Sequence, residues 1–114
     1  MSKNKTPRVL VIAGSDSSGG AGIQADIKTL TVFKVFSMTA ITAITAQNTN
    51  GVSSVESVSL DLIKNQIEDC ISDIGVDAIK IGMVNKAEIF DLIFETLKKH
   101  QIIKKVWEKS FRIS

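Results

Sequence analysis

The fold of this chain is decided by the stretch Gly14-Ser15-Asp16-Ser17-Ser18-Gly19-Gly20-Ala21-Gly22-Ile23-Gln24-Ala25-Asp26. It follows an apolar run at residues 9–13 and opens a long helical pattern, so it predicts a strand, a turn and a helix. Its four glycines have no Cβ and reach positive φ, which lets a ligand approach backbone N–H groups where a helix begins and its dipole favours negative charge. The stretch therefore predicts a pocket for a small molecule or a phosphate.

Two nucleotide-binding motifs compete for this stretch. A P-loop needs a lysine after its last glycine, and there is no lysine between Arg8 and Lys28, which excludes it. A relaxed dinucleotide fingerprint is matched by Gly20, Gly22 and Ala25, but the acidic residue expected about 20 positions further on is missing. A glycine-rich turn without any ligand stays open as the structural alternative.

Composition and charge narrow the class of protein. The 114 residues fit one domain, and 44% hydrophobic with 23% charged residues is ordinary for a globular chain. A net charge of +2, with lysines scattered along the chain, argues against nucleic acid as a partner. The single cysteine, Cys70, allows no internal disulfide, and no run approaches the roughly 20 apolar residues of a membrane span. We expect a soluble, cytoplasmic protein that does not bind membranes, with Cys70 in the core.

Strand and helix patterns alternate along the chain. Apolar, β-branched runs predict strands, and residues spaced three or four apart predict helices that pack on them. A polar turn is expected at residues 47–51, at the carboxyl end of the second strand. The predicted order is βαβαβαβ, with strands at 8–13, 38–46, 77–81 and 102–107, and with helical stripes Ile23, Ile27, Leu30 and Phe33, then Leu60, Ile63, Ile67, Ile71 and Ile74, then Ile89, Ile93 and Leu97.

Polar or glycine-containing signals follow three of these strands. They stand at Ala13-Gly14, at Ala46-Gln47 and at Ile81-Gly82-Met83. Because ligands of open α/β sheets bind beyond the carboxyl ends of the strands, these junctions are expected to line one crevice. Asn85 and Glu88 are also expected to cap the N-terminus of the third helix.

Three blocks of the sequence resemble one family closely. Residues 13–26, 42–52 and 80–83 are similar, in order and in spacing, to the bacterial hydroxymethylpyrimidine/phosphomethylpyrimidine kinases of thiamine biosynthesis, which are ribokinase-like. The resemblance implies a three-layer α/β fold with a mainly parallel sheet, of which this chain holds the N-terminal part. It also implies ATP and Mg²⁺ as cofactors, and phosphoryl transfer to the pyrimidine's hydroxymethyl group and then to the resulting monophosphate.

The resemblance places four residues at the pyrimidine: Gly14, Asp26, Gln47 and Met83. An amide donates and accepts at once, a carboxylate accepts from a hydroxyl or amine, and a thioether offers an adaptable apolar face. Each residue keeps a structural alternative. Gln47 would satisfy the backbone of the turn, Asp26 would be an exposed helix carboxylate, and Met83 would belong to the core.

The resemblance runs from about residue 8 to 106, and residues 107–114 diverge from it. The family's glycine-rich anion hole, with its catalytic base, has no counterpart here. We therefore expect a truncated kinase domain over residues 1–114, with no catalytic or metal-binding residue assigned and with the ATP- and Mg²⁺-binding residues largely absent. Whether the chain is an enzyme stays open; the alternative is an inactive remnant or a pyrimidine-binding or interaction fragment. The unpaired outer strand of such a sheet favours pairing with another chain, hence a possible homo-oligomer.

Overall fold

One five-stranded sheet forms the centre of the molecule. The structure is a computed structural model and describes residues 6–108, including the backbone but not the side chains of residues 107 and 108. The strand order is β3-β2-β1-β4-β5; all neighbours are parallel except β2 and β3, which are antiparallel. The strands are β1 (Arg8–Ser15), β2 (Phe36–Asn48), β3 (Gly51–Ser57), β4 (Ala78–Ile81) and β5 (Val106–Glu108).

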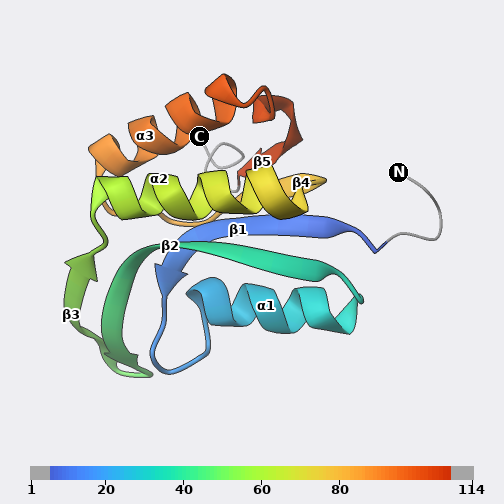
Figure 1. Ribbon diagram of the computed structural model, residues 1–114. Coiled ribbons are helices and arrows are strands. Elements are labelled where there is room, and N and C mark those ends of the chain that lie inside the picture. Colours follow the sequence, from blue (N-terminus) through green and yellow to red (C-terminus); the bar gives the residue numbers. More distant parts are fainter. Residues whose placement is uncertain (1–5, 109–114) are drawn as a thin grey trace.

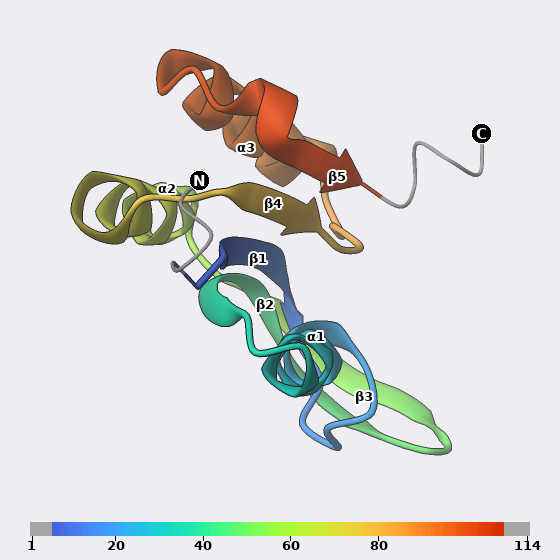
Figure 2. The same cartoon turned by 90° about the vertical axis from the view of Figure 1, so that its right-hand side faces the viewer.

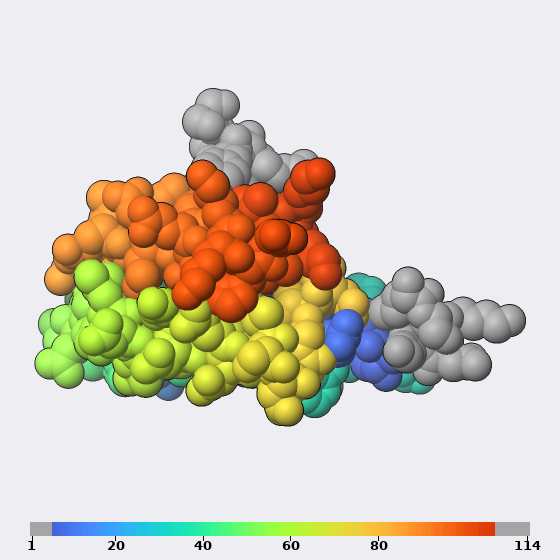
Figure 3. All heavy atoms as spheres, turned by 45° about the horizontal axis from the view of Figure 1, so that its top comes forward, coloured from blue at the N-terminus to red at the C-terminus, as the bar shows by residue number. Residues whose placement is uncertain are grey.

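Helices cover both faces of this sheet, which gives three layers (Figures 1 and 2). Helix α1 (Gly22–Val32) lies on one face. Helices α2 (Leu60–Asp69), which continues into a π-helical turn at Cys70–Ile74, and α3 (Ala87–Lys99) lie side by side on the other face (Figure 3). The predicted three-layer α/β architecture with a mainly parallel sheet is therefore confirmed.

The larger core lies between the sheet and helices α2 and α3. Alternate residues of β1 and β4 point into it, and the predicted stripes of both helices meet them there, except that Leu60, the first residue of α2, is 40% exposed. Cys70 packs against this core, and burial raises the pKa of its thiol, as expected for a structural cysteine. The fully buried members include Leu10, Ile12, Ile79, Ile81, Ile63, Ile67, Ile89, Ile93 and Leu97.

The smaller core lies under α1 and corrects one prediction. Val11, Ala13 and Ile23 are buried there, whereas Phe33 is 73% exposed. Only the first residue of the expected stripe is thus buried among the described residues. Phe33 lies just outside the helix, as its C-cap.

Strand β3 is the element that the sequence did not predict. It forms a hairpin with β2, in which Asn48 pairs with Gly51 and Ala43 with Ser57. Residues 51–56 are exposed, so the strand has no buried face and its sequence shows no apolar alternation.

Two other predictions are corrected by the structure. The last strand begins only at Val106, after a 3₁₀ turn. Asn85 does not cap α3; its side-chain amide donates to Ser57 Oγ at 3.0 Å.

Gln66 completes the edge of β2 beyond the end of β3. Its Oε1 accepts from the N–H of Ile41 at 2.9 Å, and its Nε2 donates to the carbonyl of the same residue at 3.0 Å. One side-chain amide thereby replaces the two hydrogen bonds that a neighbouring strand would supply. The contact also ties α2 to the sheet.

An ion pair between Arg8 and Asp77 lies at the amino-terminal ends of β1 and β4. Arg8 donates to Asp77 from its backbone N–H at 2.8 Å and from its guanidinium at 2.9 and 3.1 Å, while the N–H of Asp77 donates to the carbonyl of Arg8. These hydrogen bonds, the guanidinium's first, lower the pKa of Asp77 to about 2. They join the starts of β1 and β4.

We predict that Gln66→Ala lowers the free energy of unfolding by about 2 kcal/mol, because it leaves both polar backbone groups of Ile41 without a partner. Urea unfolding measures the change. The matched control is Asn65→Ala on the exposed side of the same helix, which removes an amide of similar size. Equal effects of the two substitutions would contradict the assigned role.

The Arg8–Asp77 pair predicts a specific pH dependence. A carboxyl whose pKa is lowered by folding stabilises the fold above its unfolded pKa of about 3.9, and this stabilisation is lost as the pH falls through about 2. The free energy of unfolding should therefore fall between pH 4 and pH 2 more steeply in the wild-type chain than in Asp77→Asn. Other carboxyls titrate equally in both chains, so the difference reports Asp77; parallel curves would rule the pair out.

Candidate functional site

The glycine loop is held by a carboxylate of its own. Asp16 is only 4% exposed, and one of its oxygens accepts from the N–H and the hydroxyl of Ser18 at 2.8 and 2.7 Å. The other accepts from the N–H groups of Gly20 and Ala21 at 3.1 and 2.8 Å. These hydrogen bonds, the Ser18 hydroxyl's first, lower the pKa of Asp16. The N–H groups of Ser18, Gly20 and Ala21 are therefore already occupied.

Gly22 lets α1 begin directly against the end of β1. Its φ is 60°, and a Cβ at this position would lie 2.4 Å from the carbonyl oxygen of Gly14. No other residue fits without moving one of the two backbones. Gly14 itself is less constrained, since a Cβ there would meet Ala43 at the ordinary contact distance of 3.6 Å.

Gln47, at the carboxyl end of β2, is fastened to the loop through its backbone. Its N–H donates to Ser17 Oγ at 2.8 Å, and the same hydroxyl donates to its carbonyl at 3.0 Å. The side-chain Oε1 lies 3.2 Å from Thr45 Oγ1, which also donates to the Ser15 carbonyl at 2.8 Å. The hydroxyl of Ser17, and not the side-chain amide of Gln47, forms hydrogen bonds with the backbone at this position. The alternative in which the Gln47 side chain only satisfies the backbone of the turn is therefore not supported.

Asp26 lies on α1 and is paired across the sheet. Its Oδ1 forms an ion pair with Nζ of Lys80 on β4, and its side chain is 17% exposed. It is thus not the exposed helix carboxylate that the alternative supposed. Lys80 belongs to the block 80–83 noted in the sequence, but no role could be predicted for it, because a lysine inside a short apolar strand gives no indication of its partner.

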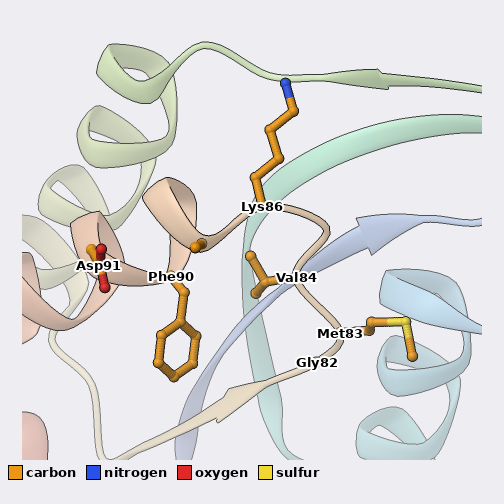
Figure 4. A pocket seen from close by; sticks show the side chains of 7 residues that line it. Gly82, Met83, Val84, Lys86, Phe90 and Asp91 are labelled. Carbon is orange, nitrogen blue, oxygen red and sulfur yellow. The ribbon is translucent and has the colours of Figure 1, made fainter.

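Met83 follows β4 and is 88% exposed, which excludes a place in the core. It borders an open hollow of about 300 Å³ between the end of β4 and α3 (Figure 4). Gly14, Asp26 and Gln47 are not among the residues that line it. The hollow is lined by Gly82, Met83, Val84, Lys86, Ala87, Phe90 and Asp91.

Three of the four predicted residues therefore lie at one edge of the sheet, and the four do not line one pocket. Gly14, Gln47 and Met83 stand at or just after the carboxyl ends of the parallel strands β1, β2 and β4. This is the edge where ligands of such sheets bind. Within residues 6–108 no three His, Cys, Asp or Glu side chains gather as metal ligands. None of the helices in the same range is long and apolar enough to cross a membrane.

Solved structures place this fold among the ribokinase-like vitamin kinases. A phosphomethylpyrimidine kinase from Clostridium difficile superposes with a TM-score of 0.80 at 52% identity, over 85% of this chain and 42% of that one. The Bacillus subtilis pyridoxal kinase, in an ADP complex, superposes with a TM-score of 0.83 at 42% identity, over 91% of this chain and 39% of that one.

The phosphomethylpyrimidine kinase family model matches residues 16–110, and the chain belongs to this family. The hydroxymethylpyrimidine/phosphomethylpyrimidine kinase of Rhizobium meliloti is 50% identical over 94 residues, which are 82% of this chain and 35% of that protein. The Mycobacterium tuberculosis H37Rv enzyme is 46% identical over 96 residues, which are 84% of this chain and 35% of that protein. The chain thus spans about a third of the length of these two relatives.

We predict that Asp16→Asn loosens the loop, because an amide nitrogen cannot accept the two N–H groups that one carboxylate oxygen accepts. The backbone amides of Gly20 and Ala21 should exchange with solvent faster, measured by hydrogen exchange in NMR spectra. Asp73→Asn, at an exposed position after α2, is the matched control and should leave these amides unchanged. Unchanged exchange in Asp16→Asn would contradict the role of the carboxylate.

Proposed function

We propose that this chain supplies the pyrimidine-binding part of a hydroxymethylpyrimidine/phosphomethylpyrimidine kinase of thiamine biosynthesis. The observation that carries the proposal is the setting of Gln47. Ser17 satisfies its backbone, and Thr45 touches only one end of its amide, so the side chain is available at the ligand-binding edge of the sheet. The relatives that cover most of this chain carry the same activity in their names.

The chemistry of the four residues suits an aminopyrimidine. The Gln47 amide donates and accepts at once, which matches a ring nitrogen beside an amino group. Asp26 accepts from a hydroxyl or amine, Met83 offers a polarizable apolar face, and the backbone at Gly14 can approach the ring. In this proposal these four residues bind the substrate and orient its hydroxymethyl group.

The residues described here do not fit the nucleotide phosphates or Mg²⁺. Three N–H groups of the glycine loop, those of Ser18, Gly20 and Ala21, are taken by Asp16, whose own oxygens each accept two hydrogen bonds. In the described part of the chain, no three His, Cys, Asp or Glu side chains gather as metal ligands. We therefore assign neither ATP nor Mg²⁺ to these residues and derive no step through them. The relatives' phosphoryl transfer from ATP to the hydroxymethyl group, and then to the monophosphate, remains part of the proposed reaction of the whole kinase.

We predict that the chain binds 4-amino-5-hydroxymethyl-2-methylpyrimidine and that Gln47→Ala weakens this binding roughly tenfold or more, as expected for the loss of two hydrogen bonds. Isothermal titration calorimetry measures both affinities. Thr49→Ala, in the exposed turn after β2, is the control and should bind like the wild-type chain.

The same samples test turnover with ATP and Mg²⁺. Binding that depends on Gln47, with or without turnover, supports the proposed site; turnover separates an active kinase from a fragment that only binds. Absence of binding by a folded wild-type chain, or equal affinities of Gln47→Ala and Thr49→Ala, would refute it.

A further inference from the structure

Lys80 has no role in the site as derived so far, although it belongs to a block that marks the family. It lies on β4 between Ile79 and Ile81, which are 1% and 0% exposed and point into the core under α2 and α3. Because side chains alternate along a strand, Lys80 points to the opposite face, where α1 lies. There its Nζ meets Oδ1 of Asp26, 54 residues away in sequence.

The pair is partly withdrawn from solvent. The side chain of Lys80 is 32% exposed and that of Asp26 is 17% exposed. A carboxylate in such a place is costly unless a cation compensates it, and a charge-assisted hydrogen bond also fixes its direction. Among the described residues, the hydrogen bonds and ion pairs of Asp26 engage Oδ1 and leave Oδ2 open.

We propose that Lys80 is a positioning residue for substrate binding. It holds Asp26 by one oxygen and directs the other toward the hydroxyl of the substrate. Paired in this way, the carboxylate carries no uncompensated charge, and its open oxygen acts as a hydrogen-bond acceptor for the hydroxyl of a hydroxymethyl-substituted pyrimidine. The inference rests on the proposed function, because it assigns a substrate contact to the same site.

A purely structural role is the competing explanation. Ile23 is the one fully buried apolar side chain on α1, and the Lys80–Asp26 pair also straps this helix to β4. A strap acts on every ligand of the site alike. A positioning residue acts only on ligands that carry the group which Asp26 accepts.

The test compares two ligands, 4-amino-5-hydroxymethyl-2-methylpyrimidine and its analogue 4-amino-2,5-dimethylpyrimidine, which lacks the hydroxyl. Calorimetry measures their affinities for the wild-type chain and for Lys80→Met, Lys80→Arg and Asp26→Asn. We expect Lys80→Met to weaken binding of the hydroxymethyl ligand roughly tenfold, as for a lost charge-assisted contact, and to leave binding of the analogue unchanged. Lys80→Arg should keep most of the affinity, because it retains the charge and the donor.

Three results overturn the inference. Equal weakening of both ligands by Lys80→Met shows a strap. If Lys80→Met binds the hydroxymethyl ligand as tightly as the wild-type chain does, while Asp26→Asn binds it more weakly, the proposed function stands and Lys80 has no part in it. If the wild-type chain binds neither ligand, both the proposed function and the role of Lys80 are refuted. Urea unfolding confirms that each variant is folded, and Lys80→Gln replaces Lys80→Met if the latter is not.

Discussion

The close approach of α1 to the end of β1 is the constraint on which the rest of the site depends. It requires glycine at position 22, and the Asp16 carboxylate then folds the intervening loop around itself. The folded loop presents Ser17 to the backbone of Gln47, and the helix that follows carries Asp26 to Lys80. One local contact thus sets the positions of side chains contributed by β2, α1 and β4.

The opposite end of the sheet is closed by different means. There the Arg8–Asp77 pair joins the starts of β1 and β4. These contacts pair the charged groups of Arg8 and Asp77 with one another. At the carboxyl edge, by contrast, the Gln47 amide and one Asp26 oxygen stay open among the described residues. The division follows the general rule for parallel sheets, whose ligands gather beyond the carboxyl ends.

Sequence patterns predicted the elements that are buried and missed those that are not. The strand at residues 8–13, the stripe of α3 and the stripe of α2 after Leu60 were predicted correctly, because burial on defined faces imposes an apolar period. Strand β3 has no buried face, so nothing in its serine-rich sequence distinguishes it from a loop. Phe33 looked buried because its spacing continued a helix that ends at Val32. The Lys80–Asp26 pair depends on a contact across the sheet, which no local pattern contains.

Whether a glycine-rich loop can bind a phosphate depends on whether its N–H groups are free. Glycine-rich turns before a helix attract phosphates because their N–H groups are unpaired. In this loop the negative charge comes from the chain itself, since Asp16 accepts the N–H groups of Ser18, Gly20 and Ala21. A second anion beside these N–H groups would be repelled by the Asp16 carboxylate. The loop therefore serves to place Ser17, and through it the backbone of Gln47.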